Sequence, residues 1–367
     1  MPFGIYLHVP FCLQKCPYCD FYSTAIDPQT ADRYLAAMLR AITFFSGHYA
    51  HNKVDSIYFG GGTPSLLGAK RLLCILEHVS RNFDISSKVE ITVEVNPASG
   101  IKSELQALRS SGVNRLSFGV QSLRKSELEL LERPHSAKEA VKAILDAADS
   151  GFEHISADLM LALPGQTVAH MSESIAGFVA LPLDHISAYL LKIEDGTPFA
   201  QKNFALPNED ETAEQYLACI ELLEKAGFMQ YEISNFARPG GEARHNLKYW
   251  HCEEYLGIGP AAHSFMGGQR FYFPADLQGF IQTGNFSKLI VQDGEGGSLE
   301  EYCMLNLRLR DGLDLQKLAE LYPNADITGM LKRALRLKDF VILEDERIYL
   351  TPKGFLLSNS VIAEICL

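Results

Sequence analysis

The stretch FCLQKCPYCDFYS, residues 11–23, places three cysteines, Cys12, Cys16 and Cys19, close to the amino terminus. Spacers of three and two residues hold three thiolates on one side of a loop, which suits one compact centre of a soft metal. A structural zinc site takes four protein ligands, and a fully ligated iron–sulfur cube also takes four. The spacing therefore indicates either a fourth ligand from elsewhere or one metal position without a protein ligand.

Two kinds of metal centre fit this spacing. For zinc, His8 is the nearest candidate for a fourth ligand, but it lies in a strand-like segment where a histidine with a structural role is more common. The other centre is a 4Fe–4S cluster in which three irons are bound by cysteine and the fourth iron is open. The remaining five cysteines are scattered along the chain, and we expect them to be small buried side chains.

The overall composition excludes several classes of protein. The chain has 367 residues, of which 47% are hydrophobic and 21% are charged, as in an ordinary globular protein. The formal net charge of −12 argues against a general nucleic-acid binder. No uncharged apolar run reaches the ~18 residues that suggest a membrane span, and the start lacks the basic region of a signal peptide. The cysteine usage predicts a reducing, cytoplasmic location.

The first two-thirds of the chain alternates strand-like and helix-like segments. Six strand–helix units in series predict a parallel sheet with right-handed crossovers. The helices that follow the strands are expected mainly at 30–46, 68–82, 124–132, 136–150, 168–180 and 209–226.

Glycine or polar residues recur where these strands end, namely Gly60, Gly61, Gly62, Thr63, Glu94, Asn96, Gln121, Asp158 and Tyr189. A barrel places its chemistry on one rim that many strands supply, whereas a doubly wound sheet concentrates it at a single crevice. The even contribution from six strands favours the barrel. We therefore expect an α/β fold with a partial (β/α)6 barrel over residues 1–230.

The rhythm of the sequence changes beyond this region. Residues 231–291 are loop-rich and aromatic, and QDGEGGS at 292–298 is typical of a linker. Residues 299–367 predict a small helical, winged-helix-like domain in which FVILEDERIYLT forms a hairpin. The acidic turn of this hairpin argues against DNA binding, so we expect the domain to pack against the barrel.

The segment GGGTPS, residues 60–65, follows a strand. Three glycines allow the backbone to approach a ligand closely and to donate N–H groups. The segment lacks the lysine of a phosphate-binding P-loop and the spacing of a dinucleotide fingerprint, so a nucleotide phosphate is not indicated.

Together with the three-cysteine loop, this segment resembles the radical S-adenosylmethionine (SAM) superfamily. The resemblance implies that the open iron of a 4Fe–4S cluster chelates the amino and carboxylate groups of SAM. It implies that Tyr18 lies near the adenine and that Tyr6 flanks the cluster. The residues that it assigns to SAM contact are Gly61, Gly62, Thr63, Glu94, Gln121, Arg133 and Asp158. Without the resemblance, Tyr18 would be read as loop packing and Arg133 as half of a surface ion pair.

Longer runs place the resemblance within one branch of the superfamily. The segments CPYCDF, YFGGGTPS, VEVNP, RLSFGVQS and DLMLALPGQT resemble the branch that contains the oxygen-independent coproporphyrinogen III oxidases and the HemW haem chaperones, over nearly the whole chain. The oxidases carry a further cysteine two residues after the third, where this chain has Phe21. They also have a longer segment before the cluster loop than the eleven residues found here. Both departures put coproporphyrinogen oxidation in doubt.

The stretch RHNLKYW, residues 244–250, resembles the H-N-x-x-Y-W motif of the haem chaperones. The resemblance implies haem contact, with His245 as the candidate iron ligand, since imidazole is a common ligand of haem iron. Tyr249 and Trp250 would offer flat apolar surface, and Cys252 and His263 are weaker candidate ligands. The alternative is a loop that plugs the barrel mouth, with His245 hydrogen-bonded internally.

The resemblance therefore implies a haem chaperone that binds haem, a 4Fe–4S cluster and SAM, and that delivers haem to acceptor proteins, some of them at a membrane surface. The alternative is a radical SAM oxidase that acts on a tetrapyrrole. We expect no nucleic-acid partner and no transmembrane segment, and a homodimer is left open.

Overall fold

The computed structural model describes residues 2–98 and 102–366, and its main element is a twelve-stranded sheet. Six consecutive parallel strands form its centre, with each strand beside the next in chain order. They are β1 (Phe3–Val9), β2 (Lys53–Gly61), β3 (Asp84–Val95), β4 (Arg115–Gln121), β5 (His154–Leu161) and β6 (His185–Leu190). The predicted run of six parallel strands is confirmed.

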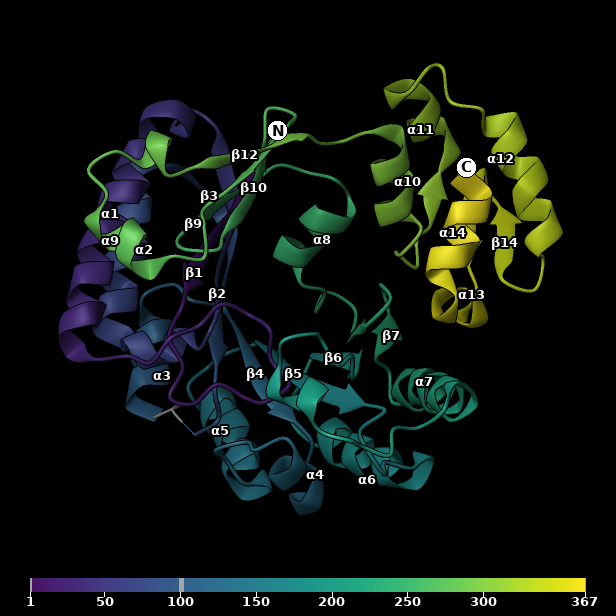
Figure 1. The fold of residues 1–367 in the computed structure, drawn as a ribbon, viewed down its shortest axis with the longest axis horizontal. Coiled ribbons are helices and arrows are strands. Elements are labelled where there is room, and N and C mark those ends of the chain that lie inside the picture. The colour runs from purple at the N-terminus through teal and green to yellow at the C-terminus, as the bar shows by residue number, and fades with distance from the viewer. Residues whose placement is uncertain (1, 99–101, 367) are drawn as a thin grey trace.

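Helices connect these strands and cover one face of the sheet (Figure 1). They are α1 (Pro28–Tyr49), α2 (Ala69–Asn82), α3 (Lys102–Ser110), α4 (Lys125–Leu130), α5 (Ala137–Asp149), α6 (Val168–Val179) and α7 (Glu209–Lys225), with short 3₁₀ turns η1 (Pro64–Leu67) and η2 (Pro198–Gln201). Side-chain caps define several starts. Asp27 accepts the Thr30 N–H at α1, and Ser136 and Asn208 form capping boxes at α5 and α7.

The sheet continues past the six parallel strands at both edges. Beside β1 lie β9 (Tyr255–Ile258), which is parallel to it, and then β10 (His263–Met266), β11 (Gln269–Tyr272) and β12 (Val291–Glu295). Beside β6 lie β8 (Asn235–Ala237), which is antiparallel to it, and β7 (Met229–Gln230). Helix α9 (Leu277–Gln282) and the turn η3 (Phe286–Lys288) join β11 to β12.

The expected linker at 292–298 is corrected in part. Its first four residues belong to β12, whose backbone pairs with β11 although its side chains are exposed. Backbone hydrogen bonding at a sheet edge needs no apolar side chain, so the polar composition concealed this strand.

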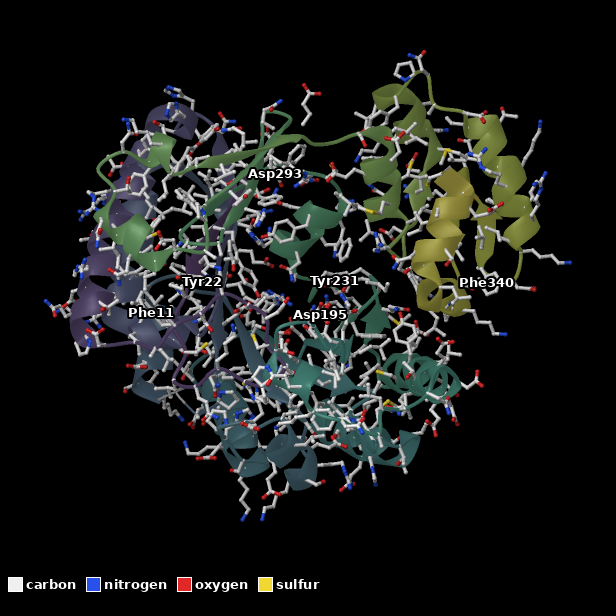
Figure 2. The ribbon with its side chains drawn as sticks, viewed as in Figure 1. Phe11, Tyr22, Asp195, Tyr231, Asp293 and Phe340 are labelled. Atoms are coloured by element: carbon white, nitrogen blue, oxygen red, sulfur yellow. The ribbon has the colours of Figure 1, made fainter. Side chains whose placement is uncertain are left out.

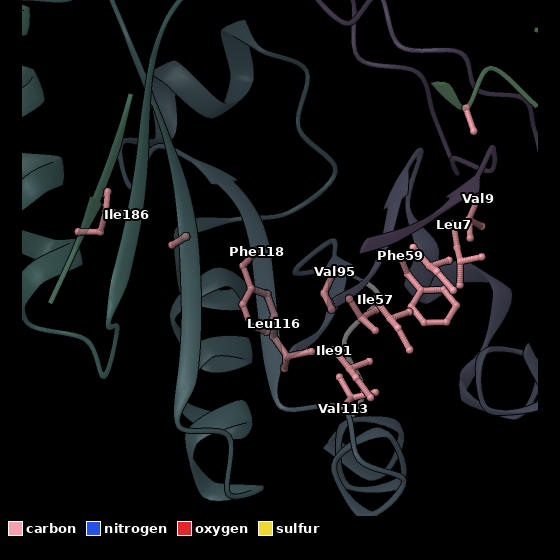
Figure 3. Close-up of a cluster of buried hydrophobic side chains, with 14 of the residues drawn as sticks. Leu7, Val9, Ile57, Phe59, Ile91, Val95, Val113, Leu116, Phe118 and Ile186 are labelled. Carbon is pink, nitrogen blue, oxygen red and sulfur yellow. The ribbon is translucent and has the colours of Figure 1, made fainter. Parts of the chain in front are cut away.

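The alternation of side chains along the strands explains why helices cover only one face. The outward residues are apolar and buried, as Figure 3 shows for Leu7, Ile57, Leu116 and Phe118 among others. The intervening residues of the same strands are polar, glycine or aromatic and point into the curve of the sheet. In β4, for example, Arg115 and Ser117 alternate with Leu116 and Phe118. One dry face and one polar, cavity-lining face are the arrangement of a barrel wall, and the sheet is an open barrel.

A small domain follows the sheet and contains a three-stranded sheet of its own, in the order β13-β15-β14. Its elements are α10 (Leu299–Asn306), β13 (Leu313–Asp314), α11 (Leu315–Leu321), α12 (Ile327–Ala334), η4 (Leu335–Leu337), β14 (Val341–Glu344), β15 (Arg347–Leu350), α13 (Pro352–Leu356) and α14 (Ser358–Cys366). The predicted hairpin is β14–β15, with its turn at Asp345 and Glu346.

The small domain packs against the barrel, as expected. Helix α13 contacts α7, and α10 contacts α8 (Arg244–Trp250). The backbone N–H of Arg310 donates to the carbonyl of Tyr231 at 2.9 Å, and Glu232 forms a β-bridge with Leu309. Figure 2 shows Tyr231 near the centre of the molecule, on the side of the barrel that faces this domain. Among the helices of the described ranges, none is long and apolar enough to cross a bilayer.

The two faces of β4 provide a test of this architecture. Phe118 is fully buried under the helices, so Phe118→Ala should lower the free energy of unfolding by roughly 3–5 kcal/mol. Ser117 lines the inner cavities, and Ser117→Ala should cost less than about 1 kcal/mol. Denaturant unfolding of the two variants measures the difference, and equal losses would contradict the assignment of the faces.

Candidate cluster and SAM site

The three-cysteine segment forms a loop between β1 and α1 that is tied at both ends. Phe11 and Thr24 form a β-bridge, the Cys12 N–H donates to the Thr24 carbonyl at 3.0 Å, and the Thr24 N–H donates to the Pro10 carbonyl at 2.7 Å. The thiols of Cys12, Cys16 and Cys19 are free and half-buried. All three line one cavity of about 180 Å³. The loop thus presents three soft ligands to one space.

The glycine segment passes close beneath this loop. The Gly62 N–H donates to the Val9 carbonyl at 2.9 Å, and the Thr63 N–H donates to the Phe11 carbonyl at 2.6 Å. A Cβ on Gly62 would lie 2.6 Å from the Phe11 oxygen. Gly61 has φ of +109°, a conformation that side chains rarely adopt. Glycine is therefore required here by backbone contact, and this contact fixes the cluster loop against β2.

Arg133 lies beside the loop. It is not half of a surface ion pair, so the alternative considered from the sequence is wrong. Its guanidinium donates to the Cys16 thiol at 3.2 Å, to the Tyr18 hydroxyl at 3.3 Å and to the Gly119 carbonyl at 2.5 Å. Its Nε is buried without a partner. The contact with the Cys16 thiol places the positive charge of Arg133 directly beside the cluster loop.

Tyr18 packs in the loop as well as lining the cavities. Its ring lies edge-on to Phe199 with the centroids 6.0 Å apart, while its hydroxyl contacts Arg133. Tyr18 lines both the 180 Å³ cavity and a larger one beside it. Tyr18 can therefore pack within the loop and face a ligand in the cavities at the same time.

Two half-buried carboxyl groups line the same cavity. Glu94 accepts a hydrogen bond from the Tyr58 hydroxyl at 2.8 Å, and burial raises its pKa to about 7. Burial also raises the pKa of Asp158 to about 6. Groups that are short of solvation in this way gain most from a positively charged ligand. Gln121 ends β4 in a left-handed conformation with φ of 73°, which turns the chain at the same rim.

The structure brings the predicted site residues together on that rim. Eleven of them line the 180 Å³ cavity, namely Cys12, Cys16, Cys19, Tyr18, Gly61, Gly62, Thr63, Glu94, Gln121, Arg133 and Asp158. Tyr6 lies in the larger cavity, and its hydroxyl hydrogen-bonds to His8 Nδ1 at 3.1 Å.

The zinc alternative fails on the position of His8. Its Nδ1 contacts Tyr6 and its Nε2 contacts the Tyr22 carbonyl at 3.1 Å, so neither nitrogen is free for a metal. Within residues 2–98 and 102–366, no three His, Cys, Asp or Glu side chains are grouped to hold a single metal ion, and this includes the three loop cysteines. The donor set at the loop is three thiols alone, which suits a cluster with one open iron.

The larger cavity has a volume of about 830 Å³ and adjoins the first, because Tyr18, Cys19, Glu94 and Asp158 line both. This volume is in the range of sites for large organic ligands. Aromatic side chains form much of its wall, with Tyr6, Tyr58, Tyr189, Tyr249 and Trp250 among them. The cavity extends from the cluster loop to the small domain, which contributes Leu305.

The RHNLKYW segment is the helix α8 and not a loop. Glu90, from β3, accepts the backbone N–H groups of His245 and Arg244 at 2.9 and 3.2 Å and so replaces a cap at the start of α8. Asn246, Tyr249 and Trp250 line the large cavity. The helix therefore presents these three side chains to any ligand there.

His245 faces the sheet. It is fully buried, with Nδ1 2.9 Å from the Ser56 hydroxyl and Nε2 2.8 Å from the Tyr249 hydroxyl. Neither nitrogen is free in this conformation, which matches the internally hydrogen-bonded alternative and opposes a role as iron ligand. The weaker candidates are not better placed, since neither Cys252 nor His263 is among the described residues that line the two cavities.

Sequence reasoning missed many residues of the large cavity, and Arg115, His185 and Glu232 are among them. The first two alternate with apolar residues in RLSFGVQ and HISAYL, so the two-residue period was a usable signal for the inner face. Glu232 lies in a short connection between β7 and β8, where no periodic signal exists.

Comparison with known proteins agrees with this geometry. Residues 6–176 match the family model of the radical SAM superfamily, and residues 298–357 match that of the HemN C-terminal domain. The chain is 32% identical to the heme chaperone HemW of Lactococcus lactis, covering 100% of this chain and 98% of that protein. It is 35% identical to HemW of Mycobacterium tuberculosis, covering 98% and 94%. The chain belongs to the HemW family of radical SAM proteins.

A solved structure has the same fold as this HemW-family chain. The coproporphyrinogen III oxidase HemN from Escherichia coli superposes with a TM-score of 0.85 at 23% identity, covering 100% of this chain and 90% of that one. The likeness confirms the parallel-sheet core with a small carboxyl-terminal domain. Membership of the radical SAM superfamily implies a 4Fe–4S cluster and SAM as cofactors.

The cluster assignment predicts that Cys12, Cys16 and Cys19 are each needed. Because a three-cysteine site has no spare protein ligand, replacing any one with Ala should sharply reduce iron and sulfide after anaerobic reconstitution. Cys74→Ala, on α2 outside the cavity, is the matched control and should retain full iron. Full iron and sulfide in the triple variant would show that the centre lies elsewhere.

Burial of His245 predicts an acid-sensitive fold. Burial lowers its pKa to about 3 in the folded protein, against about 6.5 when unfolded. The stabilisation is complete above pH 6.5 and is lost as the pH falls toward 3, because the unfolded chain then binds the extra proton. Between pH 7.5 and 5.5 this one residue should cost about 1.4 kcal/mol.

Denaturant midpoints at the two pH values measure this loss. His245→Gln should reduce the pH dependence, whereas His263→Gln, at an exposed position, should not. An unchanged slope in His245→Gln would mean that the imidazole titrates normally.

Proposed function

We propose that this protein is a haem chaperone of the HemW type, which binds haem beside a SAM-liganded 4Fe–4S cluster and delivers it to acceptor proteins. The observation that carries the proposal is the full-length similarity to HemW chaperones, since at least 94% of each of two relatives is covered. A cavity of about 830 Å³ with an aromatic wall supports it, because a flat apolar ring gains roughly 25 cal/mol per Å² buried.

In this proposal the cluster occupies the smaller cavity. Cys12, Cys16 and Cys19 hold three irons, and Tyr6 flanks this site from the adjoining large cavity. The N–H groups of Gly62 and Thr63 already donate to the cluster loop, so the Gly61–Gly62–Thr63 segment offers backbone carbonyls, and not N–H groups, to SAM. When bound, the cluster supplies an electron-transfer centre with one exchangeable iron position. Arg133 contacts the Cys16 sulfur and can meet the SAM carboxylate with its unpartnered Nε.

Haem would lie against the α8 side chains that face the large cavity. Trp250 and Tyr249 supply flat surface, and Asn246 supplies polar contact. Ligation of the iron by His245 would require the loss of its hydrogen bonds to Ser56 and Tyr249, so we assign His245 the task of anchoring α8 to the sheet.

The side chain at position 21 favours the chaperone function over the oxidase function. The Phe21 side chain is 64% exposed and lines both cavities. It supplies no thiol at the position where the oxidases resembled by the sequence carry an extra cysteine.

The test offers haem and coproporphyrinogen III in parallel to the anaerobically reconstituted protein. We expect stable haem uptake, followed by absorbance, and negligible decarboxylated product. Trp250→Ala should weaken haem binding by roughly tenfold or more because an aromatic contact is lost, while Trp250→Phe should retain most of the affinity. Robust formation of protoporphyrinogen would overturn the chaperone proposal in favour of the oxidase.

A further inference from the structure

The end of the large cavity nearest the small domain contains a carboxyl group without a charge partner. Glu232 is 1% exposed and lines the cavity. Neither of its carboxylate oxygens makes a well-aligned hydrogen bond, and the Asn235 side-chain oxygen beside it is also without a partner. Burial raises the pKa of Glu232 to about 7, and hydrogen bonding from the backbone N–H groups of residues 233–235 and from the Asn235 side chain only partly offsets this.

The groups that face Glu232 leave its charge uncompensated. Phenols of Tyr189 on β6, Tyr216 on α7 and Tyr231 on its own segment lie near it. From the small domain, Arg310 directs its guanidinium to Glu224 at 3.2 Å. None of these groups supplies a free positive charge to the carboxylate.

The wall of the cavity as a whole is electronegative. Among its described lining residues, the carboxyl groups are Asp20, Glu94, Asp158 and Glu232, and the one guanidinium is Arg115. Arg115 already lies 3.9 Å from Glu90 and donates to the Gly241 carbonyl at 2.6 Å. Burial lowers the pKa of His185 well below its ordinary value, so this imidazole is neutral.

SAM would neutralise only part of this charge. Glu94 and Asp158 line the smaller cavity, where the residues assigned to SAM lie, but Glu232 does not. After SAM binds, Glu232 therefore still has no cationic partner, and above its pKa it is a negative charge in a space from which much of the water is excluded. In such surroundings the repulsion between like charges is several times stronger than in bulk water.

We propose that Glu232 makes the large cavity select tetrapyrroles by their number of carboxylates. This inference rests on the haem-binding function proposed above. A ring with two propionates on one edge can direct both away from Glu232 and turn its apolar edge toward it. A ring with four, spread around its rim, brings at least one carboxylate toward Glu232. The selectivity therefore favours haem over tetracarboxylate rings of the same size.

Two iron porphyrins that differ in this respect are suitable probes. Iron(III) protoporphyrin IX has two propionates and iron(III) coproporphyrin III has four. Their dissociation constants are measured by absorbance titration at pH 8, where Glu232 is ionised, with the holoprotein and saturating SAM. The wild-type protein should bind the dicarboxylate ring more tightly.

The decisive quantity is the change in that preference on substitution. Glu232→Gln keeps the shape of the side chain and should reduce the preference on the order of tenfold, mainly by tightening the tetracarboxylate ring. Glu320→Gln makes the same charge change at an exposed position of α11 and should leave the preference unchanged. A preference that is the same in Glu232→Gln and the wild type would overturn the proposal.

A second measurement needs no variant and applies if Glu232→Gln does not fold. On the wild-type protein the preference should shrink between pH 8 and pH 6, because Glu232 becomes protonated together with Glu94 and Asp158 of the same cavity, so that only the Glu232→Gln variant separates the share of Glu232. A preference that is flat across this range would also overturn the inference. If the wild type binds neither ring, the haem-chaperone proposal itself fails, whereas haem binding without carboxylate discrimination removes only the role of Glu232.

Discussion

Every second residue of the six parallel strands points toward the helices, and the residues between them point into the open barrel. The outward set is apolar and buried, and the inward set is polar or aromatic, as β4 shows with Leu116 and Phe118 against Arg115 and Ser117. The hydrophobic effect therefore places the helices on one face only. The other face is left as the wall of the two cavities in which all the candidate chemistry lies.

The cluster loop depends on a single close approach of two backbones above this wall. Gly62 lies against Phe11 so tightly that a Cβ would overlap its carbonyl oxygen. The hydrogen bonds of Gly62 and Thr63 to the carbonyls of Val9 and Phe11 fix the loop that carries the three thiols against β2.

Helix α8 shows how buried polar groups can position a binding surface. It begins on the Glu90 carboxylate and is fastened to β2 through His245 and Ser56. These contacts direct Asn246 and Trp250 into the large cavity. Arg115 belongs to the same network, because its guanidinium lies near the Glu90 carboxylate. Its positive charge is therefore not available to Glu232, which stays an uncompensated carboxylate elsewhere in the cavity.

The sequence alone determined the parallel sheet, the barrel and the grouping of the three cysteines, because strand period, strand–helix alternation and short spacers are local properties. The strand ends singled out Glu94, Gln121 and Asp158. Resemblance to a family assigned them to SAM and added Arg133, and the structure brings all four to one rim. The edge strand β12, the buried orientation of His245 and the isolation of Glu232 were decided only by the tertiary structure. Each of these depends on partners distant in the chain: β11 for backbone pairing, Ser56 for the imidazole, and the small domain for enclosure of the carboxylate.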